Sequence, residues 1–341
     1  MSTTLHSAKA LAVERYLKPA KPARAFRATA VSSRPEHNVV GVGIGPKVVN
    51  NQSTPTRAVR FYVERKLPKA AVSGANMLPA SLDGVPTDVI ETDRFVAGSP
   101  AAVLHPAAPA AAISPRSRMR PAQPGCSVGF AFTGNEAGMV MAGTLGAIVR
   151  NGESLFILSN NHVLANENAL PLGAPIFQPG LLDGGDPGSD EIAALYRFVP
   201  LTASAENLVD CAIAVVSDLT IVSPEILPNV GPLRTPAPLA ATENEAVEKT
   251  GRTTGYTQGI VTDVSATIAV QYETLGVLTF DDQILIEGTG GPFSAAGDSG
   301  SLIVDRNQKQ AVGLLFAGSP SHTIANKIGN VLSALNLSIV V

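Results

Sequence analysis

Three short stretches of the chain carry side chains that could perform nucleophilic chemistry. His162 lies in FILSNNHVLA, Asp210 lies in NLVDCAIAVV, and Ser299 lies in GDSGS. Each stretch adjoins an apolar run that is typical of a β-strand. A single histidine, aspartate or GDSG turn is most often structural, but the three together, in this order, indicate one catalytic unit.

The chemistry of acyl transfer explains why these residue types would converge. A serine hydroxyl is a weak nucleophile and needs a base to take its proton. Histidine suits that task because its ordinary pKa is about 6.5, and a buried carboxylate fixes the imidazole tautomer. Because glycine lets the backbone bend, the amides of Gly297 and Ser299 can point at one developing oxyanion. We therefore predict His162, Asp210 and Ser299 as catalytic residues, and Gly297 and Ser299 as the oxyanion hole.

The same stretches resemble the chymotrypsin/trypsin-like serine proteases in their order and spacing. His162 and Asp210 are 48 residues apart, and Asp210 and Ser299 are 89 residues apart. GTLGAIV resembles the hairpin before that family's histidine, and AVGLLFAGS resembles the strand along which its substrate lies. The resemblance covers about residues 125–341. It implies a chymotrypsin-like double β-barrel with a C-terminal helix, acting as a serine endopeptidase through an acyl-enzyme and without a cofactor.

A closer resemblance extends over more of the chain. The phrases GVGIGPK, FYVERKLP, LDGVPTDVIE, AGTLGAIVR, LSNNHVLAN and IFQPG are similar to those of the bacterial relatives of the plant NARROW LEAF trypsin-like proteins. In that group a small N-terminal module precedes the protease domain. The resemblance therefore implies the same domain order here.

The protease resemblance also assigns residues around the serine. The residue six before the nucleophile lies at the base of the family's primary specificity pocket, and here it is Phe293, with Gly318 in the place of a pocket-wall glycine. Because phenylalanine offers no charge to Lys or Arg, peptides with small or apolar residues before the scissile bond are expected. Asp298 matches the aspartate that receives a new N-terminus in trypsin-like zymogens. No activation junction followed by Ile-Val is recognisable, so maturation and a plain turn role for Asp298 both stay open.

Short apolar runs separated by turns must position these residues. Such a pattern from Cys126 onward predicts an antiparallel barrel or sandwich. The final apolar residues follow helical spacing and predict an amphipathic C-terminal helix; they are Ile324, Ile328, Val331, Leu332 and Leu335. The runs predicted as strands are Val128–Phe132, Met139–Val149, Leu155–Ser159, Ile192–Val199, Cys211–Val216, Gly259–Val264, Ile268–Tyr272, Gln283–Glu287, Leu302–Val304 and Ala311–Phe316.

The N-terminal third divides by composition into an arm and a module. Residues 1–36 carry seven Lys/Arg against two Glu, which predicts a basic arm that begins with a weakly periodic helix. Residues 37–96 are predicted as a small α+β module with three strands. Its GVGIG run is predicted as a glycine-rich strand and not as a nucleotide loop, because no helix follows it. The three predicted strands are 38–49, 58–63 and 85–91.

An Ala/Pro-rich segment, residues 97–124, is predicted to link this module to the protease domain at 125–341. Its prolines deny it stable helix or sheet pairing and favour an extended, semi-rigid spacer. Proteolysis is expected to concentrate here, at Arg116, Arg118 or Arg120 for another protease. Self-cleavage is expected within Ala101–Ile113.

Composition excludes several other classes of protein. The 341 residues are 45% apolar and only 16% charged, which excludes a disordered chain. Two cysteines cannot form a disulfide framework, no apolar run is long enough to span a bilayer, and no secretory signal is recognisable. We therefore expect a cytoplasmic protein with no membrane partner. The acidic loop Asp183–Glu191 offers oxygens to calcium but lacks EF-hand spacing, so a solvated loop and no metal are expected.

The sequence thus predicts a serine endopeptidase that acts on protein or peptide substrates. The alternative is a regulatory protein-binding module that keeps a protease fold with little turnover. Nucleic-acid binding through the basic arm is disfavoured because the arm lacks interleaved aromatic residues. The natural substrate and the oligomeric state stay open, with a homo-oligomer among the alternatives.

Overall fold

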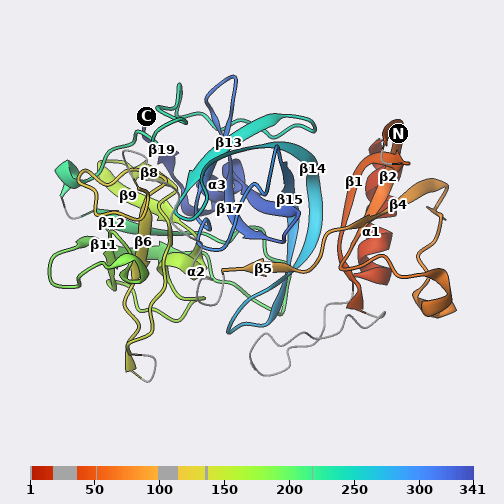
Figure 1. Cartoon of the computed structure of the whole chain (residues 1–341), viewed down its shortest axis with the longest axis horizontal. Helices are drawn as coiled ribbons and strands as arrows, with labels where there is room; N and C mark the ends of the chain where they lie inside the picture. The colour runs from red at the N-terminus through yellow and green to blue at the C-terminus, as the bar shows by residue number, and fades with distance from the viewer. Residues whose placement is uncertain (1, 18–36, 51, 99–113, 135–136, 217) are drawn as a thin grey trace.

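The computed structural model describes residues 2–17, 37–50, 52–98, 114–134, 137–216 and 218–341, and its architecture is mostly β. Two sheets account for most of the regular structure in these residues. The α-helices among them are α1 (Ser2–Tyr16), α2 (Asn161–Leu164) and α3 (Ile328–Leu335). This confirms the predicted fold class, mostly β with a C-terminal helix (Figure 1).

The first sheet carries the histidine and the aspartate of the predicted triad. It has eight strands in the order β19-β8-β9-β12-β11-β10-β6-β7, so β19 and β7 are its two edges. A two-residue turn joins β8 to β9, and Gly152 in it has a φ of 57°, which glycine adopts at little cost. One face fills an apolar core with side chains such as Val128, Ile157 and Leu195. The strands are β6 (Ser127–Phe130), β7 (Gly143–Thr144), β8 (Ala147–Asn151), β9 (Ser154–Ser159), β10 (Pro175–Phe177), β11 (Glu191–Phe198), β12 (Ala212–Val216) and β19 (Ser338–Ile339).

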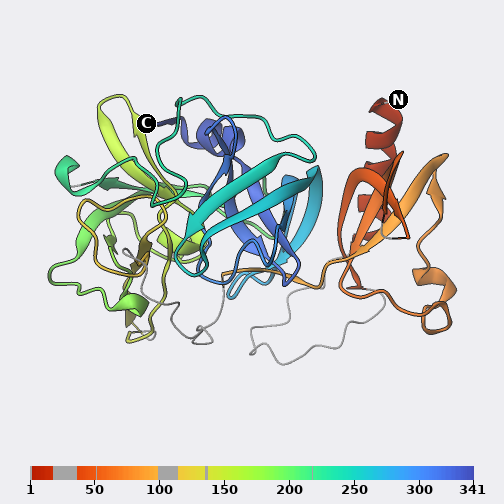
Figure 2. The ribbon, with the colours of Figure 1, turned by 45° about the horizontal axis from the view of Figure 1, so that its top comes forward.

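The second sheet contains a closed ring of six strands, and it carries the serine. The order β13-β16-β17-β18-β15-β14 is closed by pairing between β13 and β14, so every strand of the ring has a paired neighbour on both sides. Figures 1 and 2 both show the ring beside the first sheet. The strands are β13 (Ala246–Gly251), β14 (Gly255–Gln271), β15 (Val277–Gly288), β16 (Leu302–Asp305), β17 (Ala311–Gly318) and β18 (His322–Lys327).

Two sequence expectations for this half need correction. The runs 259–264 and 268–272 do not form separate strands, because β14 continues through them with register shifts that bend it without ending it. Ile324 is not in the C-terminal helix but in β18, where it pairs with Leu285 and Ala317. Sheet pairing overrides its helical spacing, and α3 begins only at Ile328. The remaining apolar residues of that helix are buried against both sheets.

The N-terminal module is a small sheet with a helix packed on it, and it continues the second sheet. Its strands are β1 (Val39–Val49), β2 (Gln52–Val63), β3 (Ser81–Leu82) and β4 (Val85–Glu91). The helix α1 buries Ala8 and Ala12 against Val59 and Phe61. β1 pairs with β14 through Val42 and Thr267, among others, which joins the module to the ring.

The glycine-rich run forms β1, as predicted, and the glycines allow a close approach. A Cβ atom on Gly43 would lie 1.8 Å from Asp263 Oδ2, and one on Gly45 would lie 2.4 Å from Arg60 Cζ. Asp263 in turn accepts hydrogen bonds from the Ile44 amide at 3.0 Å and from the Tyr62 hydroxyl at 2.7 Å. The run is therefore a docking strand, and the space that a phosphate would need is filled by protein side chains.

The segment predicted as a linker, 97–124, divides into parts with different surroundings. Ala97 ends strand β5 (Phe95–Ala97), which pairs with β14 and β17. Residues 114–124 run along the first sheet, where Ala122 is buried and Arg118 pairs with Asp190 at 2.6 Å. The stretch 99–113, which holds Ala101–Ile113, lies outside the described residues, as does most of the basic arm. Among the described residues, no helix has the length and apolar character to cross a membrane.

Candidate active site

A buried pair, His162 and Asp210, forms the core of the site. α2 follows β9 directly and carries His162, while Asp210 lies just before β12, which pairs with β9. His162 Nδ1 lies 2.6 Å from Asp210 Oδ2, and the Asn161 amide donates to Asp210 Oδ1 at 2.6 Å. Because the carboxylate accepts a hydrogen bond from Nδ1–H, Nε2 is left as the basic nitrogen. The structure thus brings together two of the three predicted catalytic residues by a direct hydrogen bond.

Tyr272 completes the surroundings of Asp210, and no sequence motif singled it out. Its hydroxyl donates to Asp210 Oδ2 at 2.7 Å, and its ring lies edge-on to His162 with centroids 6.0 Å apart. Burial and the nearby Asp210 raise the pKa of Tyr272 well above its ordinary value, so the hydroxyl stays a donor. The one available signal was a tyrosine at the end of an apolar strand, since a buried hydroxyl needs a partner.

Ser299 lies on the loop before β16 and approaches the histidine from the second sheet. Gly143 lies between the Ser299 backbone and Val163, the residue after His162, since a Cβ atom on Gly143 would be 2.6 Å from Val163 and 3.1 Å from the Ser299 carbonyl oxygen. Ser299 Oγ donates to the Phe316 carbonyl at 3.4 Å. His162 Nε2 is buried and has no hydrogen-bond partner within the described residues. The histidine nitrogen is therefore free to accept a proton, although the serine hydroxyl points to Phe316 in this structure.

Two glycines shape the serine loop. Gly297 and Gly300 have φ values of 92° and 95°, in the left-handed region that other residues adopt only with strain. A Cβ atom on Gly300 would also lie 2.1 Å from Ser159 Oγ. Within the described part of the chain, the amides of Gly297 and Ser299 donate to no protein acceptor. Both amides are thus available to an oxygen atom of a ligand.

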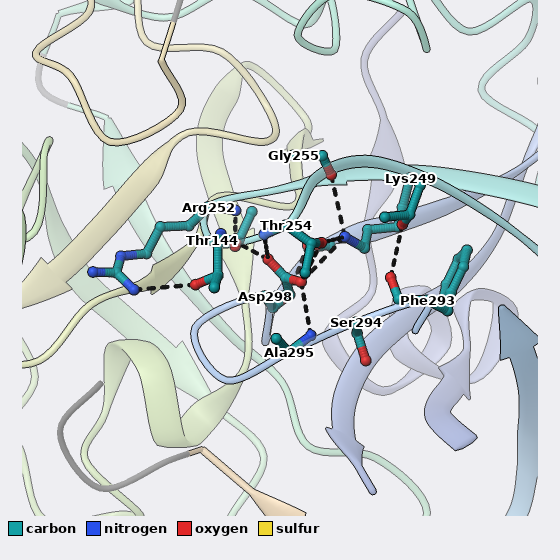
Figure 3. Close-up of polar contacts among 12 residues, drawn as sticks. Thr144, Lys249, Arg252, Thr254, Gly255, Phe293, Ser294, Ala295 and Asp298 are labelled. Carbon is teal, nitrogen blue, oxygen red and sulfur yellow. Dashed lines mark hydrogen bonds and ion pairs between the residues drawn. The ribbon is translucent and has the colours of Figure 1, made fainter. Parts of the chain in front are cut away.

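Asp298, beside the serine, is fully buried and paired with an internal cation (Figure 3). Lys249 Nζ lies 3.2 Å from its Oδ2, which also accepts from Thr254 Oγ1 at 2.6 Å and from the Ala295 amide at 3.0 Å. Burial opposes ionisation, but Lys249 and these donors hold the pKa of Asp298 below its ordinary value. Lys249 thus places a positively charged group against Asp298. In the trypsin-like zymogens that the sequence resembles, the matching aspartate receives a new N-terminus instead. The only sequence signal for Lys249 was a lysine among the buried residues of one strand.

The predicted specificity residues lie at different depths. Phe293 is 2% exposed and packs with Val261 and Ile286, with Lys249 Nζ 5.8 Å from its ring centroid. Its ring is thus part of the apolar core in this structure, and its place at the base of a substrate pocket stays a prediction. Gly318 ends β17 and lies opposite Val96 of β5.

The acidic loop uses its carboxylates for ion pairs. Asp183 accepts two hydrogen bonds from Arg252, at 2.5 and 2.7 Å, and Asp190 pairs with Arg118. The Arg252 amide donates to Thr144 Oγ1, which itself donates to the Gly297 carbonyl. In the described residues no cluster of three or more His, Cys, Asp or Glu has the arrangement of a metal site. The contacts of Arg252 and Thr144 thus connect the acidic loop to the serine loop.

Comparison with known proteins finds neighbours among solved structures. No protein-family profile and no curated protein matches the sequence. Thermobifida fusca protease A is similar at 19% identity and a TM-score of 0.45, over 64% of this chain and 99% of that one. A glutamic-acid-specific serine protease is similar at 19% identity and 0.45, over 64% and 100%. Cellulomonas bogoriensis chymotrypsin is similar at 18% identity and 0.40, over 58% and 90%. The structural neighbours are thus chymotrypsin-like serine proteases.

Proposed function

We propose that the chain is a serine endopeptidase. The observation that carries the proposal is the buried His162–Asp210 pair, 2.6 Å apart, in which His162 Nε2 has no partner among the described residues. A purely structural histidine would be expected to use both ring nitrogens once buried. An unpaired basic nitrogen beside a serine is the arrangement that acyl transfer requires.

The reaction follows from the positions of these groups. Ser299 Oγ turns from the Phe316 carbonyl and attacks the peptide carbonyl carbon while His162 Nε2 takes its proton. Asp210 stabilises the imidazolium that forms, and the amides of Gly297 and Ser299 stabilise the oxyanion. His162 then protonates the leaving amine, and water hydrolyses the acyl-enzyme by the same proton route. This chemistry needs no cofactor.

A fluorophosphonate probe tests the proposal, because it reacts with activated serines. We expect covalent labelling of Ser299 in the wild-type protein and none in Ser299→Ala or His162→Ala. Circular dichroism and thermal unfolding of the variants control for folding. An intact, folded wild-type protein that is never labelled would overturn the proposal and favour the regulatory protein-binding module.

We further propose that the chain is a bacterial relative of the plant NARROW LEAF trypsin-like proteins and that it acts in the cytoplasm. The phrases shared with that group support the first point. Cys126 and Cys211 support the second, since both are buried free thiols, as expected in a reducing compartment. Fractionation of cells expressing the full chain, followed by immunodetection, tests the location.

A further inference from the structure

Strand β5 is the point where the N-terminal part of the chain enters the second sheet. Its Val96 and Ala97 pair antiparallel with Gly318 and Ala317 of β17. On its other side, Phe95 and Val96 pair parallel with β14. Figure 1 shows β5 running from the module into the sheet. A three-residue segment is thus held between two strands, as an added peptide strand would be.

An aromatic side chain fixes this segment at the catalytic residues. Phe95 is fully buried and belongs to the apolar cluster that contains Tyr272, Phe280 and Phe316. Tyr272 donates to Asp210, and the Phe316 carbonyl accepts from Ser299. The anchor of β5 therefore packs on the residues that hold both ends of the triad.

Gly98, the next residue, reaches the triad itself. Gly98 directly follows Ala97, the last residue of β5, which pairs with Ala317 next to Phe316. The Phe316 carbonyl oxygen is 3.4 Å from Ser299 Oγ. From the other side, a Cβ atom on Gly98 would lie 3.6 Å from His162 Cδ2. Gly98 also has a φ of 69°, in the region that favours glycine. Gly98 thus lies beside the predicted base, His162, and follows a strand that pairs next to Phe316, the residue that contacts the predicted nucleophile.

We propose that the first substrate of this site is the chain itself, and that Ser299 cleaves it after Gly98. The proposal rests on the proposed function. Pairing on β17 and the Phe95 anchor hold Gly98 beside His162, and such positioning makes an intramolecular attack far faster than a bimolecular one. The site of self-cleavage is thereby placed before, and not within, Ala101–Ile113.

The step balances without any co-reactant other than water. Ser299 Oγ bonds to the Gly98 carbonyl carbon, and its proton passes through His162 Nε2 to the nitrogen of the following residue as the C–N bond breaks. Water then hydrolyses the ester, which restores Ser299 and leaves a carboxylate on Gly98. The products are residues 1–98 and 99–341. Because Phe95 and β1 stay paired with the second sheet, the shorter product stays bound on the acyl side of the site and competes with other substrates.

Intact-mass spectrometry of the purified full chain tests the proposal. We expect wild-type protein to convert to fragments 1–98 and 99–341 with a rate constant that is unchanged by tenfold dilution, while Ser299→Ala stays whole. Gly98→Val should slow the cut at least tenfold, because a β-branched residue disfavours this φ and crowds His162. Gly84→Val is the matched control, since Gly84 has a similar φ of 78° with open space around it and lies far from the site.

A second variant guards against misfolding of Gly98→Val. Val96→Pro keeps Gly98 but removes one backbone donor of β5, and it should slow the cut in the same way. Fluorophosphonate labelling of the wild type and of Val96→Pro separates the two proposals. Labelled protein that stays whole, is cut elsewhere, or is cut at a concentration-dependent rate would overturn self-cleavage and leave the protease proposal standing. Absence of labelling in both proteins would overturn the protease proposal, and self-cleavage with it.

Discussion

Two fully buried carboxylates, Asp298 and Asp210, lie next to the predicted nucleophile Ser299 and the predicted base His162, and the protein satisfies them in opposite ways. Asp298 faces the ammonium group of Lys249, along with hydroxyl and amide donors. Besides His162, the described residues offer the Asp210 carboxylate only neutral donors: the Asn161 amide and the Tyr272 hydroxyl. A carboxylate that is already neutralised can only hold a loop in place. A carboxylate surrounded by neutral dipoles has no other cation beside it, so its charge can stabilise the imidazolium that the proposed reaction forms.

The largest effect on activity is expected from removing the charge of Asp210, the carboxylate with neutral donors. Asp210→Asn keeps the shape but offers His162 the wrong tautomer, so kcat should fall by about 10⁴-fold. Steady-state kinetics on a peptide substrate measures the effect, with thermal unfolding as the folding control. The double variant Asp210→Asn/His162→Ala should be little worse than the worse single variant, because a triad acts as a unit. Additive losses would contradict a shared role.

Removal of the cation from the other pair should cost stability first and activity second. Lys249→Met leaves Asp298 buried without its counter-ion, which should lower the free energy of unfolding by about 3–5 kcal/mol. Urea denaturation at pH 7 measures it. Adding Asp298→Asn removes the uncompensated charge as well, so the double variant should recover part of the loss. Equal stability of Lys249→Met and wild type would show that the pair does not hold the loop.

Substrate preference tests the residue that packs beneath that pair. If Phe293 closes the pocket, peptides with Ala or Val before the scissile bond should exceed Lys or Arg peptides in kcat/KM by about 10–200-fold. A peptide library with one varied position measures this ratio, and Ser299→Ala serves as the blank. A strict requirement for Lys or Arg would show that Phe293 does not line the specificity pocket.

Tyr272 sharpens the account of Asp210 with a smaller change. Tyr272→Phe removes one donor to the carboxylate but keeps the ring, so kcat should fall by about tenfold, as expected for a hydrogen bond to a charged group. As a positioning residue, Tyr272 should also move the pH profile of kcat, because its hydroxyl holds the carboxylate that orients His162. A lower Tm with an unchanged kcat and pH profile would mean that its role is only structural.

The smallest expected effect is a pH dependence that belongs to Asp298 alone. Its pKa in the folded chain lies below its ordinary value of 3.8, so the folded state binds fewer protons than the unfolded state around that pH. The stabilisation is therefore complete above pH 3.8 and is lost as pH falls through the folded value. Urea titrations from pH 5 to pH 3 should show a steeper decline for wild type than for Asp298→Asn. Parallel curves would show that other carboxylates dominate acid unfolding.

The sequence was sufficient for features that depend on local pattern. The motifs around His162 and Asp210 predicted a pair that the fold joins by a hydrogen bond, and the alternating Val and Gly of the GVGIG run predicted strand β1. The apolar runs that form β9, β11 and β12 were found because each has its own turns and periodicity. Strands β10, β13 and β18 were not predicted, and the run Met139–Val149 divides into β7 and β8. The roles of the triad and of the oxyanion amides stay predictions until activity is measured.

Features that depend on distant partners were out of reach. Nothing near Lys249 in the sequence points to Asp298, and nothing near Tyr272 points to Asp210, because these contacts arise only when the strands assemble. Ile324 has helical spacing, yet its backbone pairs with β15 and β17. Register shifts allow β14 to pass through a stretch that local pattern divides in two. In each case a long-range pairing outweighs the local preference.

The position of β5 also orders events during synthesis of the chain. Phe95–Ala97 leaves the ribosome early, but its partners in β14 and β17 are among the last parts to be made. Contacts so distant in sequence form late in folding. Ser299 and β17 emerge almost together, so β5 gains its pairing partner β17 in the same short interval in which Ser299 is made. In a nascent chain, the proposed catalytic centre is therefore accessible to neighbouring proteins only briefly before β5 pairs with β17.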